Sequence, residues 1–392
     1  MLPGIGVFGT GPIVRVLVPI LRNNGFLVEA VWGRTQEEAE CLANDLNIPF
    51  YTNKVDEVLL HKNVDLVCIM CPPQLHGQIA VKALGIGKHV LCDRPAGLCQ
   101  SSVLKMVNAA QYYPSLISVM SHGLRFLPAF MQARRLVEQH YIGELNVCET
   151  RIHCGPLIDN QFDWMCDEHM GGGVLGILGS HVVDILYYLT GQKAMLLNGM
   201  VKTYNKQSRR ISGIRSITSD DFCTFQMELD RGASATVTLN NHIPGQFFQE
   251  ILICGTRGRL TLRGSDLYGQ KLSQNKEELL YRDIDDLARS TSSLEVTGTH
   301  LPKPYLRGLF KLITALKGAF AAIEDKHSWV KEPVAMAATF EDGLYTQAVL
   351  DAVKESSKKK EWVKVQVITE PPNPHPHLSP PGRRTGTMSY VY

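Results

Sequence analysis

The chain has 392 residues, which is long enough for two domains, and its 44% hydrophobic and 20% charged residues are typical of a globular protein. Forty lysines and arginines against 38 aspartates and glutamates leave a formal net charge of +2. This balance gives no electrostatic reason to expect nucleic acid or an anionic membrane as a partner. We also expect no membrane-spanning helix, because no uninterrupted apolar run reaches the length that a bilayer requires.

The first 92 residues alternate apolar strands with amphipathic helices. Pro12 suits the first turn of a helix, Pro19 should bend that helix, and Thr35 with Glu38 forms a capping box for the next one. Such alternation predicts an α/β fold with a parallel, doubly wound sheet, that is, a Rossmann domain. Strands are predicted at residues 4–8, 28–32, 65–70 and 89–92, and helices at 12–21, 35–46 and 76–84.

The pattern changes near Ser121. Residues 221–229, 233–240 and 247–254 alternate with a period of two, which predicts an open antiparallel sheet. Helices are expected at residues 128–139, 179–189 and 335–356. We therefore predict a Rossmann domain over residues 1–121, an α/β substrate and dimerisation domain over 122–366, and a disordered, proline-rich tail over 367–392.

Gly9, Thr10 and Gly11 lie between the first predicted strand and the first helix, which is the context that a dinucleotide-binding turn needs. Gly9 would make the tight turn, and Gly11 would let the backbone approach a pyrophosphate at the helix N-terminus. The third glycine position holds Val14. The alternative is a plain strand-to-helix turn without a ligand.

Arg34 and Thr35 follow the second predicted strand, where an NAD site usually has an acidic residue for the ribose hydroxyls. Arg34 offers planar donors to a 2′-phosphate, and no carboxylate takes that position to repel it. We therefore expect NADP(H) as cofactor, with NAD(H) as the alternative. The competing interpretation makes Arg34 a solvated loop residue.

Three later motifs, together with Arg125-Phe126 and Glu341-Asp342-Gly343, indicate a resemblance to a known family. The chain resembles the glucose–fructose oxidoreductase, inositol dehydrogenase and rhizopine-catabolism dehydrogenase family over nearly all of residues 1–366. The resemblance implies hydride transfer between a nicotinamide cofactor and a sugar, polyol or dihydrodiol, often in a homodimer paired through the open sheet. The motifs are Cys71-Pro72-Pro73-Gln74-Leu75-His76, the run from Lys88 to Asp93-Arg94-Pro95, and Gly171-Gly172-Gly173-Val174-Leu175 with Gly179-Ser180-His181 and Asp184.

The resemblance also implies roles for single residues. Cys71, Pro72, His76, Asp93 and Arg94 would border the cofactor. The family's lysine corresponds to Arg94 and its motif aspartate to Ile177, and only its histidine is kept, as His181. Arginine can donate hydrogen bonds but accepts no proton, and isoleucine cannot titrate.

His181 is therefore the expected acid/base, Arg94 the expected substrate anchor, and Asp184 the residue that orients His181. The alternative for His181 is a structural role in its helix. Three functions remain open: an NADP-dependent oxidoreductase with a weakened catalytic set, a catalytically inactive NADP(H)-binding protein, and a secreted matrix-interaction protein.

Residues 1–21 are apolar but lack a basic segment, and their glycines match the nucleotide turn. We therefore expect no cleaved signal peptide and a cytoplasmic protein, with secretion as the alternative. The sequence has 10 cysteines, and Cys68 with Cys71 has CxxC spacing. No second such pair completes a zinc site, so we expect buried free thiols and no metal.

Overall fold

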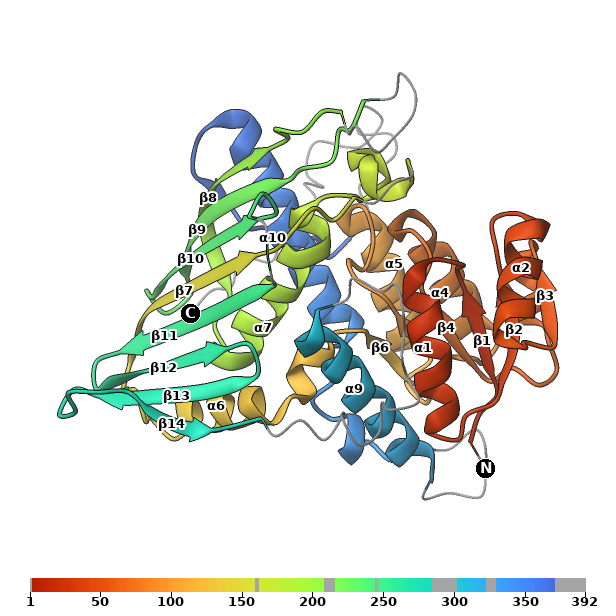
Figure 1. Ribbon diagram of the computed structural model, residues 1–392, viewed down its shortest axis with the longest axis horizontal. Helices are drawn as coiled ribbons and strands as arrows, with labels where there is room; N and C mark the ends of the chain where they lie inside the picture. The colour runs from red at the N-terminus through yellow and green to blue at the C-terminus, as the bar shows by residue number, and fades with distance from the viewer. Residues whose placement is uncertain are drawn as a thin grey trace. The chain divides into compact units, whose positions relative to one another are not determined.

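A computed structural model describes residues 2–158, 162–207, 216–243, 245, 247–283, 302–321 and 329–370, so most of the predicted tail lies outside it. The chain forms two compact units that interleave along the sequence (Figure 1). The first unit takes residues 1–96, 105–127 and 284–340, and the second takes 97–104, 128–283 and 341–392.

The first unit is built on a parallel six-stranded sheet with the order β3-β2-β1-β4-β5-β6. This order confirms the predicted Rossmann fold. Successive strands are added on one side of β1 up to β3 and on its other side from β4 onward, and nucleotides bind at this switch point in such folds. The strands are β1 (Ile5–Phe8), β2 (Val28–Trp32), β3 (Phe50–Thr52), β4 (Leu66–Ile69), β5 (His89–Cys92) and β6 (Ser118–Met120).

The helices of this unit begin close to where the caps and prolines predict. Pro12 is the first residue of α1, and Pro19 lies inside that helix, which continues to Asn23. The helices are α1 (Pro12–Asn23), α2 (Gln36–Leu46), α3 (Val55–Leu59), α4 (His76–Gly85) and α9 (Lys303–Ala321), with short 3₁₀ turns η1 (Pro73–Leu75), η2 (Gly123–Phe126) and η6 (Glu332–Val334). Helix α5 (Gln100–Tyr112) is shared between the two units.

Helix α9 completes the core of the first unit, although it comes from late in the sequence. Leu312, Ile313 and Leu316 are fully buried in one apolar cluster with residues of β1 and α1, and α9 lies beside α1 in Figure 1. At its crossing with η2, a Cβ on Gly123 would lie 2.4 Å from the carbonyl carbon of Gly308. The two backbones therefore touch, and only glycine allows that approach.

The second unit is built on a nine-stranded sheet with the order β14-β13-β12-β11-β7-β10-β9-β8-β15. Its pairs are antiparallel except for β7 with β10, which are parallel. The prediction of a large open antiparallel sheet is confirmed, with this one parallel pair added. The strands are β7 (Leu145–His153), β8 (Ala194–Lys202), β9 (Phe222–Leu229), β10 (Ser234–Asn240), β11 (Phe248–Gly255), β12 (Gly258–Arg263), β13 (Asp266–Lys271), β14 (Glu278–Tyr281) and β15 (Val363–Lys364).

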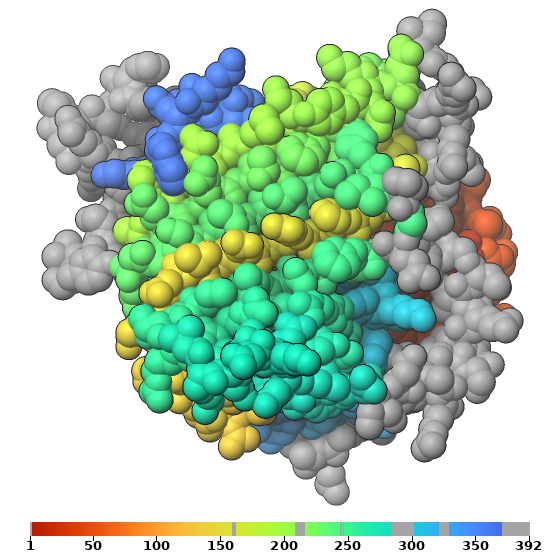
Figure 2. All heavy atoms as spheres, turned by 60° about the vertical axis from the view of Figure 1, so that its left-hand side comes forward, coloured from red at the N-terminus to blue at the C-terminus, as the bar shows by residue number. Residues whose placement is uncertain are grey.

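The two faces of this sheet differ. Cys223, Phe225 and Met227 of β9 are buried on the inner face, which the helices α6 (Pro128–Glu138), α7 (Ser180–Thr190) and α10 (Phe340–Lys359) cover (Figure 1). The alternate residues point to the outer face. Figure 2 shows that face as a continuous surface of strand side chains, with β7 crossing it as a yellow band.

Two expectations need correction. Helix α10 begins at Phe340 rather than near residue 335, because Ala338 and Thr339 pair with the edge of β6 as extended backbone. By length and composition, residues Glu168–Thr190 could cross a membrane, contrary to our expectation. However, 89% of the apolar part of this segment is buried inside the structure, as in the core helix of a globular unit.

Candidate functional site

The turn after β1 has the geometry of a phosphate cradle. Gly9 has φ +129°, and a Cβ there would lie 2.6 Å from the carbonyl oxygen of Met70. Gly11 has ordinary extended backbone, and nothing lies within 4 Å of a Cβ built on it. Gly9 thus fits the turn against β4, whereas the space in front of Gly11 is open.

The N-terminus of α1 is suited to an anion. No side chain caps it, and its first turn holds no acidic residue. The helix dipole and the N–H groups at the start of a helix therefore favour a negatively charged group beside Gly11. Val14, at the third glycine position, is fully buried and serves the core. The residues present fit a dinucleotide pyrophosphate.

Arg34 and Thr35 immediately precede α2, next to this turn, and Thr35 is the N-cap of that helix. A Cβ on Gly33 would lie 3.0 Å from Cγ2 of Thr10, so the two loops are in contact. Oγ1 of Thr35 accepts a hydrogen bond of 3.2 Å from the backbone N–H of Glu38, which confirms that half of the capping box. The Glu38 carboxylate pairs instead with Arg34 at 2.5 Å. The Arg34 side chain is 79% exposed, and a carboxylate does lie beside it, which our sequence analysis overlooked.

His76 holds two loops together. Its Nδ1 lies 3.1 Å from the carbonyl oxygen of Pro95 and its Nε2 lies 2.7 Å from that of Cys71, so the ring joins the segments that follow β4 and β5. Burial lowers the pKa of His76, although the charge of Asp93 opposes that shift. Burial raises the pKa of the Cys71 thiol to about 12. Both pKa shifts favour the uncharged form of the side chain. We therefore assign His76 and Cys71 a structural role in the two loops.

Asp93 and Arg94 form an ion pair at the end of β5. Nη1 of Arg94 donates to Oδ1 of Asp93 at 2.9 Å, and the side chains are only 14% and 13% exposed. The Asp93 N–H donates to the carbonyl of Ile69 in β4, and the Arg94–Pro95 peptide bond is cis. The Arg94 guanidinium is therefore held in place by its neighbour Asp93.

His181 lies on a helix of unusual winding in the second unit. A π-helical turn at Leu175–Gly179 leads directly into α7, and such turns often occur at functional sites. Ile177, His181 and Asp184 follow one another at helical spacing, and His181 and Asp184 are both buried. The sequence analysis placed His181 and Asp184 on one helix face, and both lie in α7, whereas Ile177 lies in the π-helical turn before it.

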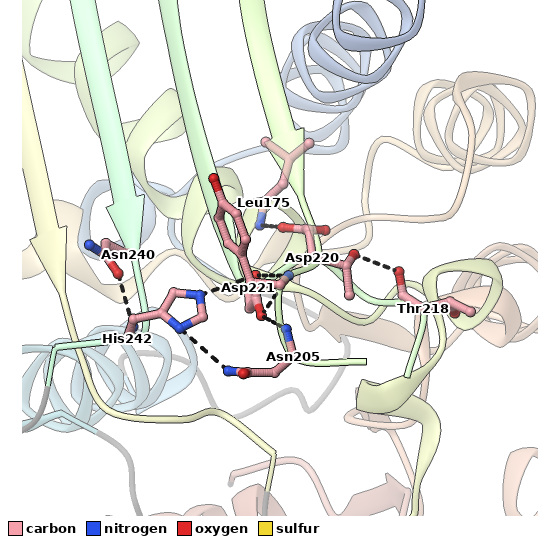
Figure 3. Close-up of polar contacts among 9 residues, drawn as sticks. Leu175, Asn205, Thr218, Asp220, Asp221, Asn240 and His242 are labelled. Carbon is pink, nitrogen blue, oxygen red and sulfur yellow. Dashed lines mark hydrogen bonds and ion pairs between the residues drawn. The ribbon is translucent and has the colours of Figure 1, made fainter. Parts of the chain in front are cut away.

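Two adjacent carboxylates at the start of β9 were not foreseen. Oδ2 of Asp220 accepts a 2.7 Å hydrogen bond from the backbone N–H of Leu175, where the π-helical turn begins. The Asp221 carboxylate accepts from the N–H groups of Tyr204 and Asn205 and lies 3.2 Å from Nε2 of His242. Figure 3 shows the two side chains turned toward these different partners. Their only sequence signal is a pair of aspartates before an alternating strand.

Family models account for most of the chain. Residues 4–121 match an oxidoreductase-family NAD-binding Rossmann fold, and residues 134–365 match the C-terminal alpha/beta domain of an oxidoreductase family. Mouse glucose-fructose oxidoreductase domain-containing protein 1 is 50% identical over 97% of this chain and 96% of its own. The chain belongs to the glucose–fructose oxidoreductase, inositol dehydrogenase and rhizopine-catabolism dehydrogenase family.

Other relatives span the same length. Human glucose-fructose oxidoreductase domain-containing protein 2 is 49% identical over 96% of this chain and 97% of its own. Among solved structures, levoglucosan dehydrogenase in complex with NADH and L-sorbose has a TM-score of 0.76 at 19% identity, covering 93% of this chain and 99% of that one. At that identity the likeness is one of fold. An oxidoreductase-family protein with a nicotinamide dinucleotide-binding Rossmann domain is therefore established.

Proposed function

We propose that this protein binds NADP(H) and uses it to exchange a hydride with a hydroxyl-bearing carbon of a sugar, polyol or dihydrodiol. The observation that carries the binding step is the open backbone at Gly11 beside the uncapped N-terminus of α1. The solved neighbours that hold NADH with levoglucosan or L-sorbose support this class of cofactor and substrate.

The preference for NADP(H) rests on Arg34. The Arg34 side chain is exposed and can turn from Glu38 toward a 2′-phosphate, because a surface ion pair of this kind contributes only about 0.2–1 kcal/mol. In contrast, Glu38 offers the acceptor that ribose hydroxyls of NAD(H) would use. Arg34 therefore favours NADP(H), and Glu38, which lies beside it, favours NAD(H).

Calorimetry of NADPH and NADH binding tests this preference. Arg34→Gln should weaken NADPH binding by about tenfold or more, because charge-assisted hydrogen bonds contribute about 1.5–3 kcal/mol each. Glu38→Gln should strengthen NADPH binding and weaken NADH binding. Equal affinities for both cofactors in the wild type, unchanged in Arg34→Gln, would refute the preference.

In the proposed reaction His181 takes the proton of the substrate hydroxyl. Arg94 donates hydrogen bonds to the substrate while Asp93 fixes its orientation. The nicotinamide, when bound, accepts or supplies the hydride. Because Arg94 and Ile177 accept no proton at the positions where the family has lysine and aspartate, turnover should be slow: loss of one acid/base group typically costs about 10²–10⁴ in rate.

A screen of sugars, polyols and dihydrodiols with NADP⁺ tests the reaction. Slow wild-type turnover should disappear in His181→Ala, with the unfolding free energy measured in parallel to exclude misfolding. Turnover that is unchanged in His181→Ala would overturn the assignment of His181 as the acid/base.

The second candidate is an NADP(H)-binding protein without turnover. The observation that favours it is the Asp93–Arg94 ion pair, since it fixes a permanently charged group where a titratable lysine is needed. In this case activity would appear only in the double variant Arg94→Lys with Ile177→Asp.

We further propose a homodimer paired through the outer face of the nine-stranded sheet. Phe222, Asn240, His153 and Phe248 are register partners on four neighbouring strands, and Phe248 is 42% exposed. This row combines two phenylalanines and a histidine with one asparagine, and an exposed aromatic side chain such as Phe248 is typical of an interface. Sedimentation at micromolar concentration should show a dimer that Phe248→Arg dissociates, and a monomeric wild type would contradict the proposal.

A further inference from the structure

Asp220 connects three segments of the second unit. It lies two residues before β9, it contacts Gly173 in the glycine loop at residues 171–173, and it accepts hydrogen bonds from the start of the helix that carries His181. Its backbone carbonyl accepts the N–H of Val174 at 2.9 Å, and its Oδ2 accepts the N–H of Leu175 at 2.7 Å. Two consecutive N–H groups at the beginning of this helix therefore donate hydrogen bonds to the same residue, Asp220.

The glycine loop is shaped around this carboxylate. Gly173 has φ +111°, and a Cβ on it would lie 2.1 Å from Oδ1 of Asp220. The carbonyl of Gly173 in turn accepts the N–H of Ile177 at 3.0 Å. The loop, the carboxylate and the first turn of the helix therefore fit together in one arrangement.

That arrangement sets where the helix begins. Between Leu175 and Gly179 the backbone is wound as a π-helix, and α7 follows from Ser180, whose Oγ donates to the carbonyl of Gly176 at 2.7 Å. A change in how the first turn starts would be transmitted as a rotation of the residues behind it, because an α-helix advances about 100° per residue. His181 comes six residues after Leu175.

We propose that Asp220 is a positioning residue, which fixes the start of the π-helical turn and thereby the orientation of His181. This inference rests on the proposed acid/base role of His181 and deepens it. Asp220 itself is buried and acts through Leu175 and Gly173, so we do not place it in contact with substrate.

Asp221 supplies a matched control. It is the next residue, it is also buried, and it also accepts backbone N–H groups, but those belong to Tyr204 and Asn205. A general loss of stability at the beginning of β9 should follow substitution of either aspartate. An effect on His181 should follow only substitution of Asp220.

The experiment compares Asp220→Ala and Asp220→Asn with Asp221→Ala by NMR of the His181 ring Cε1–H. Asp220→Ala should move this resonance, Asp220→Asn should move it less because its amide oxygen can still accept from Leu175, and Asp221→Ala should leave it in place. If Asp220→Ala does not fold, the comparison of Asp220→Asn with Asp221→Asn decides. An unmoved resonance in a folded Asp220 variant, or an equal shift in the matching Asp221 variant, would overturn the inference.

Turnover gives a second measurement where the wild type is active. Asp220→Ala should lower kcat by about 10–100-fold and change KM little, since displacement of a catalytic group by about 1 Å can cost that much. The NMR result does not depend on turnover. A protein without activity would therefore refute the proposed reaction and leave the positioning inference to be decided by the resonance.

Discussion

Gly9 and Gly11 lie in one turn, but the fold itself requires glycine only at Gly9. At Gly9 the backbone conformation and the carbonyl of Met70 both exclude a side chain. At Gly11 the protein itself has room, and the backbone is in a conformation open to any residue. Gly9 is therefore needed for the fold, and Gly11 leaves space for the ligand.

Alanine at each position should separate these requirements. Gly9→Ala should destabilise the protein by about 1–3 kcal/mol, because a residue is forced into a sparsely populated conformation and against a backbone oxygen. Gly11→Ala should leave the unfolding free energy within about 0.5 kcal/mol and weaken dinucleotide binding by about tenfold or more. Chemical denaturation and calorimetry measure the two effects. Gly11→Ala with wild-type affinity would contradict the placement of the pyrophosphate.

Asp220 should also contribute to the pH dependence of the free energy of unfolding. Burial raises its pKa to about 6 from the ordinary value of 3.8, against the hydrogen bond from Leu175. A carboxyl whose pKa is raised by folding binds its proton more tightly in the native state. Its contribution to stability is therefore most favourable near pH 4 and declines as the pH rises through about 6.

Asp220→Asn removes this titration and keeps the acceptor. The difference in unfolding free energy, variant minus wild type, should rise between pH 4 and pH 7 and then level off. The other titrating groups are common to both proteins and cancel in the difference. A difference that is flat over this range, measured by urea denaturation, would show that Asp220 does not titrate there.

At the scale of elements, the crossing of α9 and η2 shows how closely two segments can pack when both lack a side chain. Gly123 and Gly308 face each other, and a Cβ on Gly308 would lie 2.6 Å from the carbonyl carbon of Gly123. Neither neighbour is a flexible side chain that could move aside. The position of α9 against the Rossmann core depends on this contact.

Gly308→Ala should therefore destabilise the protein by about 1–3 kcal/mol, as overpacked substitutions do. Gly318→Ala in the same helix is the control. Its Cβ would meet only the Pro333 side chain at 3.3 Å, and alanine is the better helix former by about 1 kcal/mol. In thermal unfolding, Gly308→Ala should melt below the wild type and Gly318→Ala at or above it.

Elements that carry their own boundary signals could be predicted. The first two strands, α1 and α2 begin within a residue or two of their expected positions because glycine, Pro12 and Thr35 mark their ends. Helix α9 was not predicted within the Rossmann unit, since its partners in the core are distant in sequence. His181 could be found from its motif, whereas Asp220 could not, because it acts on Leu175 through a contact that no local pattern records.

At the scale of the molecule, the two units do not follow each other along the chain. The first unit contains residues near the N-terminus and residues of α9, with most of the second unit between them in sequence. Leu309, Leu312 and Phe320 of α9 are buried in the same cluster as Ile5 and Leu17. A fragment that ends after η2 would expose this apolar surface.

We expect the fragment 2–127 to be unfolded or aggregated by circular dichroism and sedimentation. Joining residues 302–340 to it through a flexible linker should restore a cooperative unfolding transition and dinucleotide binding, because the missing side of the core is then supplied. A fragment 2–127 that folds alone and binds NADPH would show that α9 is dispensable.

This interleaving has a consequence for biosynthesis. On the ribosome, β1 emerges early, and α9, which covers its core, arrives only after strands β7 to β14 of the second sheet have been translated. During that interval the nascent nucleotide unit has an uncovered apolar surface, which is the kind of surface that chaperones bind. Strands β7 to β14 of the second sheet precede α9 in the chain, so this sheet can begin to assemble before the last helix of the nucleotide unit has been synthesised.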